Sequence, residues 1–196
     1  MAKHILIIDG HPDCKADHYV HALSAAYRDG AQAGGHQVRG IVVSELWFPV
    51  LRTSEDFQTG TPTDAIRKAQ EWLVWADHVV ILFPLWLGSM PALLKAFFEQ
   101  LLRPGFAFTP TEGRLFPRAK RLAGRSARVI VTTGMPGWYY RWYFRAHSVK
   151  SLKRNILRAC GLSPVRMSIL GAVETATQAD RGGWLSRVHR LGTLAR

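Results

Sequence analysis

Short runs of apolar residues alternate along the chain with longer segments in which apolar side chains recur every three or four positions. Such runs, bounded by turn residues, are typical of strands buried on both faces of a sheet. We expect five strands, over residues 4–8, 37–43, 78–83, 128–132 and 165–170. The intervening periodicity predicts helices over about residues 18–33, 63–75, 91–103 and 143–160, with a final helix after residue 177.

Residues with special backbone preferences mark the ends of several of these helices. Thr63 can cap the second helix, and Pro91 fits the first turn of the third. Gly34 and Gly161 follow predicted helices, as expected for residues that end them. The stretches at 44–62 and from about 104 to 124 are predicted to be long connections.

Strands that alternate with helices predict a parallel sheet covered on both faces, because parallel neighbours need right-handed crossovers. A dinucleotide-binding fold would place G-x-G-x-x-G after the first strand, but Asp9-Gly10-His11-Pro12-Asp13-Cys14 stands there. We therefore expect one α/β domain over residues 1–196, a flavodoxin-like doubly wound sheet with the order 2-1-3-4-5. In this topology the ligand site lies at the carboxyl ends of the strands, where the strand order reverses.

Length and composition narrow the class of protein further. The 196 residues are 47% apolar and 20% charged, which excludes a largely disordered chain. The longest uncharged stretch, residues 79–94, is too short for a membrane span and contains two prolines. Cys14 and Cys160 are the two cysteines, which excludes a disulfide framework or a zinc site built on cysteine. We expect a cytoplasmic protein and no bound metal.

The net charge of +12 is unevenly distributed. Residues 1–100 carry a net charge of −3, whereas residues 101–196 carry +15. On charge alone, this asymmetry favours a solvated basic surface. An anionic partner, such as nucleic acid, a membrane surface, a phosphorylated cofactor or an acidic protein, is the alternative. No nucleic-acid-binding motif is present, so we expect no nucleic-acid partner.

Three predicted loops at the carboxyl ends of the first, third and fourth strands share one crevice. Two of them are rich in large apolar side chains: Leu85, Trp86 and Leu87 in one, and Trp138, Tyr139 and Tyr140 in the other. These residues suit a planar heteroaromatic ligand, although a hydrophobic lid or a dimer contact would explain them as well. The first loop leads into a helix N-terminus, where free amides attract phosphate. An ordinary strand–helix turn would offer the same amides.

Three segments together resemble the flavodoxin-like NAD(P)H:quinone oxidoreductase family. They read IIDGHP at 7–12, FPLWLGSMPALLKAFFE at 83–99 and VTTG at 131–134, and Tyr140 and His147 follow downstream. The stretch GFAF at 105–108 is also similar to this family. The resemblance extends over roughly residues 3–170, and its motifs occur in the expected order on the expected elements.

The resemblance implies a homodimer that binds FAD or FMN without a covalent bond and reduces quinones with hydride from NAD(P)H. It implies four groups of site residues. His11, Lys15, Ala16, Asp17 and His18 would contact the cofactor phosphate; Pro84, Leu85, Trp86 and Leu87 would lie along the flavin ring; Thr132, Thr133 and Gly134 would bind its pyrimidine end; and Tyr140 and His147 would act in catalysis near the flavin carbonyl.

The chain departs from the family pattern in its first loop. Ala16, Asp17 and His18 stand where members commonly have a serine, a variable residue and an asparagine, and Asp13 and Asp17 oppose the positive charge of this loop. His147 lies one residue further along than in the mammalian enzymes, and a surface position on a helix is the alternative interpretation for it.

Three other hypotheses remain open. The first is a soluble flavin-binding regulatory subunit of a membrane potassium-efflux system, whose basic half would contact the membrane surface or a membrane protein. The second is an electron-transfer flavodoxin, which the basic charge disfavours. A third concerns the reductant: the surplus of arginine favours NADPH over NADH, because arginine suits a 2′-phosphate.

Overall fold

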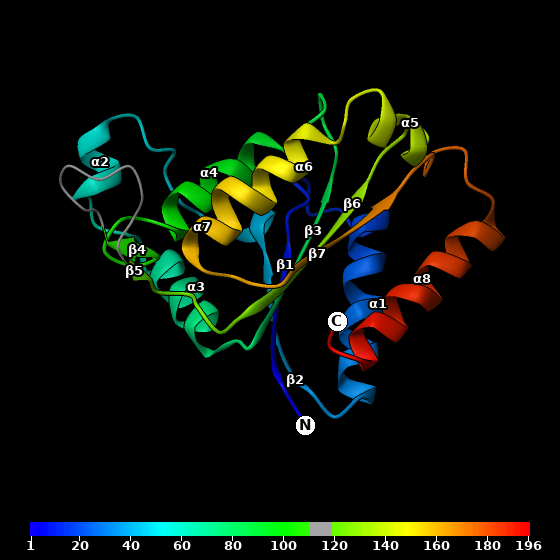
Figure 1. Ribbon diagram of the computed structural model, residues 1–196, viewed down its shortest axis with the longest axis horizontal. Helices are drawn as coiled ribbons and strands as arrows, with labels where there is room; N and C mark the ends of the chain where they lie inside the picture. The colour runs from blue at the N-terminus through cyan, green and yellow to red at the C-terminus, as the bar shows by residue number, and fades with distance from the viewer. Residues whose placement is uncertain (110–118) are drawn as a thin grey trace.

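A five-stranded parallel sheet forms the centre of the molecule (Figure 1). The computed structural model describes residues 1–109 and 119–196. The strand order is β2-β1-β3-β6-β7, and every neighbouring pair is parallel. The strands are β1 (His4–Asp9), β2 (Gln37–Val42), β3 (His78–Pro84), β6 (Ser126–Thr132) and β7 (Val165–Leu170). The predicted flavodoxin-like order 2-1-3-4-5 is confirmed.

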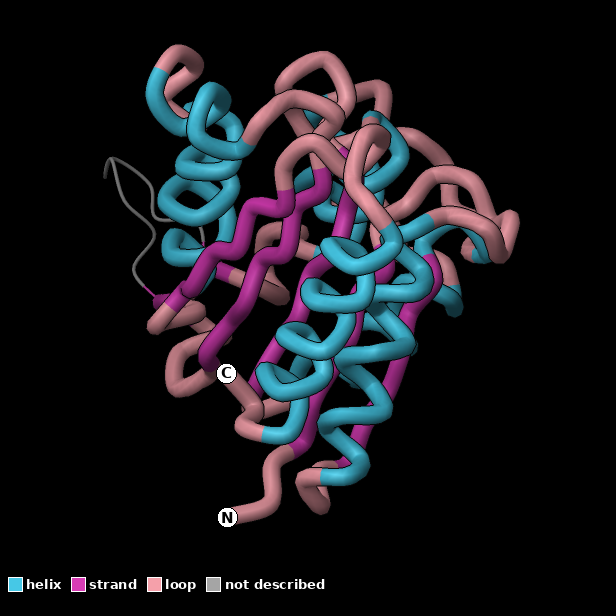
Figure 2. Tube along the Cα trace, turned by 90° about the vertical axis from the view of Figure 1, so that its right-hand side faces the viewer, coloured by secondary structure: helices cyan, strands magenta, loops and turns pink. Residues whose placement is uncertain are grey.

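Helices cover both faces of the sheet (Figures 1 and 2). One face carries α1 (Tyr19–Ala33) and α8 (Gln178–Thr193) side by side. The opposite face carries α3 (Asp64–Trp75), α4 (Ala92–Leu101) and a continuous helical segment formed by α6 (His147–Ser151), the π-helical η2 (Leu152–Leu157) and α7 (Arg158–Cys160). All five predicted helices are therefore present, and the two layers enclose two hydrophobic cores.

The two cores follow from the alternation of side chains along each strand. In β1, Ile5 and Ile7 pack beneath α1 and α8, whereas Leu6 and Ile8 face the helices on the other side. All four are essentially inaccessible to solvent. Because successive side chains of a strand point to opposite faces, a run that is apolar at every position is what a doubly covered strand needs.

The structure corrects the expected course of the chain between residues 133 and 160. A short helix, α5 (Gly137–Trp142), lies within the stretch predicted as a loop, and the helix predicted from 143 begins only at His147. Arg145 and Ala146 adopt left-handed backbone conformations, with φ of 50° and 49°. A helix cannot continue through such residues, so the chain turns there.

The two long connections also contain structure. The first includes the 3-10 turn η1 (Val43–Glu45) and α2 (Ser54–Gln58), which begins with a capping box between Thr53 and Asp56. The second contains a small antiparallel pair, β4 (Phe108–Thr109) and β5 (Ala119–Lys120), where only loop was expected. Residues 110–118 of that predicted loop lie outside the described residues.

Three of the residues predicted to mark helix ends do so in the structure, whereas Pro91, expected in the first turn, directly precedes α4. Thr63 caps α3 by accepting a hydrogen bond from the amide of Ile66, and Gly34 and Gly161 follow α1 and α7. Within the described ranges, no helix combines the length and the apolar character needed to cross a membrane.

Helices α1 and α8 approach closely because glycines line their contact. A Cβ atom added to Gly192 would lie 2.3 Å from the carbonyl oxygen of Tyr27 and 2.8 Å from the amide nitrogen of Ala31. On the other helix, a Cβ on Gly30 would lie 1.9 Å from the carbonyl oxygen of His189. These distances are shorter than van der Waals contact, so the backbones meet where a side chain would hold them apart.

We expect Gly192→Ala to lower the free energy of unfolding by about 1–3 kcal/mol, the usual cost of overpacking a tight contact. Gly182→Ala is the matched control in the same helix, because no atom lies within 4 Å of a Cβ at that position. Alanine there stabilises the protein by up to about 1 kcal/mol through its higher helix propensity. Urea denaturation of both variants measures the difference, and equal effects of the two substitutions would contradict this account of the crossing.

Candidate active site

Backbone hydrogen bonds bring three loops together at the carboxyl ends of β1, β3 and β6. The amide of Gly10, after β1, donates to the carbonyl of Leu82 in β3 at 2.7 Å. The amide of Leu85, after β3, donates to the carbonyl of Thr132 in β6 at 2.8 Å. The rings of His11 and Trp86 meet edge to face with centroids 6.3 Å apart. The three loops therefore form one surface, as the topology predicted.

The loop after β3 ends in a tight turn that displays two apolar side chains. Trp86 and Ser89 exchange both backbone hydrogen bonds, at 2.8 and 2.9 Å. Between them, Leu87 and Gly88 have φ of 46° and 76°. The left-handed conformation suits glycine but is unfavourable for leucine, and residues held in it cluster at functional sites. The turn leaves Trp86 half exposed and Leu87 fully exposed.

A pocket of about 470 Å³ separates this turn from the loop after β6. It is lined by residues from the β3 loop, the β6 loop, α5, α6 and the turn between these two helices: Leu87, Gly88, Met135, Tyr140, Phe144, His147 and Ser148. Its size lies within the range of small-molecule sites, and most of its lining side chains are apolar or aromatic. The two residues predicted as catalytic, Tyr140 and His147, therefore share one pocket.

Tyr140 and His147 differ in how firmly they are held. Tyr140 is buried, and its hydroxyl lies 2.7 Å from the hydroxyl of Ser148. His147 is the exposed first residue of α6, as its surface interpretation predicted. The chain reversal at residues 145 and 146 places both groups at the pocket, because it brings the start of α6 back against α5.

The strand end of β6 supplies the polar part of the site. Thr132 and Thr133 are both buried, and the amide of Thr133 donates to the carbonyl of Leu170 at 2.9 Å. The hydroxyl oxygen of Thr133 accepts a hydrogen bond from the amide of Met135 at 3.3 Å, which leaves its hydrogen to donate elsewhere. Gly134 lies against Glu174, because a Cβ there would be 3.0 Å from the carboxylate.

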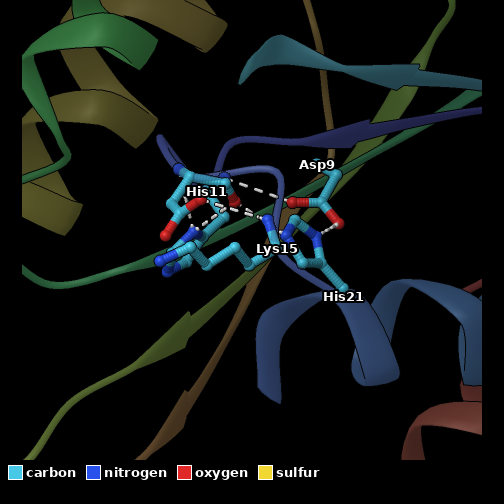
Figure 3. A network of polar contacts seen from close by, with 5 residues as sticks. Asp9, His11, Lys15 and His21 are labelled. Atoms are coloured by element: carbon cyan, nitrogen blue, oxygen red, sulfur yellow. Dashed lines mark hydrogen bonds and ion pairs between the residues drawn. The ribbon is translucent and has the colours of Figure 1, made fainter. Parts of the chain in front are cut away.

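A network of histidines and aspartates organises the loop after β1 (Figure 3). Asp9, at the end of β1, accepts hydrogen bonds from Nδ1 of His21 at 2.7 Å and from the amide of His11 at 3.2 Å. The second ring nitrogen of His21 lies 2.9 Å from the carbonyl oxygen of Asp13. The rings of His11 and His18 stack with centroids 3.9 Å apart. The network ties β1, the loop and α1 to one another.

The buried His11 and the partly buried His21 of this network have opposite pKa shifts. Burial lowers the pKa of His11, and the neighbouring histidines add to that effect against the hydrogen bond to Asp13. Burial also opposes the charge on His21, but its hydrogen bonds to Asp9 and to the Asp13 carbonyl outweigh burial and raise its pKa. Both ring nitrogens of His21 face acceptors, so the doubly protonated ring suits this position.

The rest of this loop is open to solvent and carries the predicted phosphate-binding residues. Lys15, Ala16 and Asp17 are exposed, and His18 immediately precedes α1. No side chain in the described parts of the chain caps α1, and its first turn contains no acidic residue. A helix N-terminus of this kind attracts anions through its free amides.

The residues present fit a phosphorylated flavin. The pocket offers apolar walls for a planar ring, and the strand end of β6 offers polar groups for the edge of that ring. The loop after β1 offers amides and basic side chains for a phosphate. Among the described residues, no group of three or more His, Cys, Asp or Glu side chains is arranged to hold a metal ion.

Sequence reasoning missed several residues of this site. Asp9 and His21 were not assigned roles, although Asp9 ends a predicted strand and His21 lies three positions after His18 on a predicted helix. These positions in the sequence indicate that both residues lie beside the first loop of the site. Ser148 and Phe144 carried no such signal, because their places at the pocket depend on the unexpected chain reversal before α6.

A model of a protein family with the flavodoxin-like fold matches residues 3–188 of this chain. The match spans nearly the whole sequence and agrees with the observed strand order. The chain therefore belongs to this family.

One related sequence and two solved structures show which individual proteins the chain is similar to. Human ribosyldihydronicotinamide dehydrogenase [quinone] is 30% identical over 142 residues, which cover 67% of this chain and 56% of that protein. The chain thus spans little more than half the length of this relative. The structure of an NAD(P)H:quinone oxidoreductase from Methanothermobacter marburgensis superposes with a TM-score of 0.80 at 22% identity, covering 98% of this chain and 96% of that one. An FMN-dependent NADH-azoreductase from Bacillus anthracis, in complex with FMN, superposes with a TM-score of 0.74 at 18% identity, covering 100% of both chains.

We expect His21→Gln to destabilise the protein more at about pH 5.5 than at about pH 9. The pKa of His21 is raised in the folded protein, so its contribution to stability is complete below the ordinary histidine pKa of 6.5 and is lost as the pH rises through the raised value. The free energy of unfolding of both proteins, measured by urea denaturation across this range, gives the difference.

His4→Gln is the matched control for this measurement. His4 also faces an aspartate, but its ring nitrogen lies 3.8 Å from Asp77 and both side chains are about half exposed. An exposed pair contributes little to stability, so this variant stays close to the unmodified protein at both pH values. A loss for His21→Gln that grows with rising pH would contradict the paired arrangement of Asp9 and His21.

Proposed function

We propose that this protein is a flavin-dependent oxidoreductase that passes hydride from NAD(P)H to a quinone or a similar acceptor. The observation that carries the proposal is the convergence of three loops on one crevice, with an apolar pocket at one end and a basic, amide-rich loop at the other. The family membership and the quinone-reducing relative support it. FMN or FAD is the expected cofactor, and the FMN complex of the similar azoreductase supports FMN.

Each loop has a separate task in this proposal. The flavin supplies the chemistry of accepting and donating hydride. The side chains of Trp86 and Leu87 would shield the ring from water, and the Thr133 hydroxyl, whose hydrogen is free to donate, would hold its polar edge. Tyr140 lines the pocket, and its hydroxyl is held by Ser148. This hydroxyl would serve as a hydrogen-bond donor to the negative charge of the reduced flavin.

The location and the reductant are finer parts of the proposal. We place the protein in the cytoplasm, where a reducing environment suits an exposed free thiol at Cys14 and a buried one at Cys160. Arg141 and Arg145 lie exposed near the pocket, on α5 and just after it, and favour NADPH because an arginine fork matches its additional phosphate.

We expect the purified protein to bind FMN or FAD, with Trp86→Ala weakening that binding about tenfold through the loss of aromatic contact. Quenching of flavin fluorescence on titration measures the affinity, and NAD(P)H oxidation with a quinone measures turnover. Trp75→Ala is the control, because Trp75 stacks on His4 at the opposite end of the sheet. A protein that binds neither flavin would overturn the proposed function, and equal affinities for the two variants would remove Trp86 from the site.

A cluster of exposed aromatic side chains beside the pocket supports a homodimer. Trp138, Trp142 and Tyr143 are 70%, 77% and 62% exposed, and the neighbouring Phe144 is 41% exposed. Large apolar patches of this kind mark interaction surfaces, and a second copy of the chain would cover them near the flavin.

We therefore expect a dimer at micromolar concentration, and replacement of Trp138 and Trp142 together by serine to shift the protein toward monomer. Loss of two large apolar contacts from a standard interface weakens association by about a hundredfold. Sedimentation velocity measures the mass of the unmodified protein and of the double variant. If the unmodified protein is a fully active monomer, the proposed dimer is wrong.

The same surface favours a second candidate function. Arg141 lies among the exposed aromatic residues and Arg145 directly follows them in the chain, and this combination also suits an anionic membrane surface or a membrane protein. A regulatory subunit of a potassium-efflux system would use it in that way. Co-sedimentation of a monomeric, catalytically inactive protein with anionic vesicles would favour this candidate over the enzyme.

A further inference from the structure

The loop that we expect to receive the flavin phosphate already holds a carboxylate of its own. We propose that Asp13 acts as an internal competitor of that phosphate and so determines how strongly the protein distinguishes phosphorylated from unphosphorylated flavin. This inference rests on the proposed function. It concerns a residue that the sequence reasoning noted only as unfavourable charge.

The contacts of Asp13 are those that an incoming phosphate would need. Its Oδ1 accepts a hydrogen bond from the amide of Lys15 at 3.1 Å, and its Oδ2 lies 2.9 Å from Nε2 of His18. Lys15 and His18 are two of the residues expected to contact the phosphate. One backbone donor and one basic ring are therefore already satisfied within the chain.

The environment keeps Asp13 ionised. The hydrogen bond from His18 lowers its pKa most, and the hydrogen bond from the Lys15 amide lowers it further. The carboxylate consequently carries its negative charge throughout the neutral range. A phosphate at the same donors would meet like charge at close distance and would also have to displace two hydrogen bonds.

The geometry allows displacement without unfolding the loop. The Asp13 side chain is 40% exposed, so water can replace its contacts. The backbone of the same residue is held separately, because its carbonyl oxygen lies 2.9 Å from Nδ1 of His11 and 2.9 Å from Nε2 of His21. The side chain can therefore move while the loop keeps its course.

Riboflavin, which carries no phosphate, is the reference ligand for measuring how strongly Asp13 opposes the phosphate of FMN. Riboflavin shares the ring and the ribityl chain of FMN but lacks the phosphate, so Asp13 opposes only FMN. In the unmodified protein the two ligands should bind with similar affinity, since the gain from the phosphate is offset by the displaced carboxylate. Asp13→Asn keeps the shape and the acceptor for the Lys15 amide but removes the charge.

The test is a fluorescence titration of flavin-free protein with FMN and with riboflavin, at low and at high salt. We expect Asp13→Asn to raise the ratio of the riboflavin Kd to the FMN Kd roughly tenfold, the scale of one charge-assisted contact. The riboflavin Kd should change by less than about twofold, and the gain should shrink at high salt because screening weakens charge interactions. A ratio that stays the same or falls would overturn the inference.

Asp29→Asn is the control for net charge alone. Asp29 is exposed near the far end of α1, outside the expected phosphate site, and removing its carboxylate changes the net charge by the same amount. It should change the ratio much less than Asp13→Asn, and an equal change would show that only net charge matters and would overturn the inference. Asp13→Ala distinguishes a structural role of this side chain from competition with the phosphate. If the loop needs the side chain to fold, the variant loses affinity for both FMN and riboflavin. That result would also contradict the inference.

The two proposals fail in different ways. If none of these proteins binds FMN or riboflavin, the proposed function is wrong. If the unmodified protein binds both flavins and Asp13→Asn leaves their ratio unchanged, the proposed function stands and only the role of Asp13 is wrong.

Discussion

The parallel pairing of β1 with β2 on one side and β3 on the other is the constraint on which the rest of the structure depends. From β1 the chain passes through α1 to reach β2 on one side, and then through α3 back over β1 to reach β3 on the other. Because both crossovers are right-handed, the two helices lie on opposite faces. The loop that leaves β1 leads to α1 on one face, whereas the loop that leaves β3 leads to α4 on the other, so the two loops part at the strand ends, where a ligand can enter.

Because both faces of the sheet must be covered, the helices on each face have to pack closely against the strands. Every strand residue of β1 after His4 is buried, so neither face can be left to water. On one face α1 and α8 meet through glycine backbones, which leaves room for the apolar side chains of both helices to point toward the sheet. On the other face the helical segment from His147 to Cys160, which is π-helical over η2, shares one hydrophobic core with side chains of β6 and β7.

Electrostatics at the site differ from what the net charge of the chain suggests. The molecule is strongly basic, yet at the loop after β1 two histidines face carboxylates, His21 facing Asp9 and His18 facing Asp13. The buried partner, Asp9, holds His21 and the backbone of the loop, whereas the half-exposed Asp13 faces solvent. Position relative to the sheet thus separates a carboxylate that maintains structure from one that a ligand can displace.

The sequence by itself determined the sheet, its strand order and the loops of the site, because apolar runs, glycine and proline positions and the alternation of strands with helices are local signals. It also predicted Trp86, Thr133 and His11 near one crevice, since parallel strands end at the same edge. Only the tertiary structure decided the chain reversal at Arg145 and Ala146, which brings Ser148 against Tyr140. The pairing of Asp9 with His21 was likewise decided there, because contacts between elements depend on how a helix is rotated over a sheet, and no local pattern encodes that rotation.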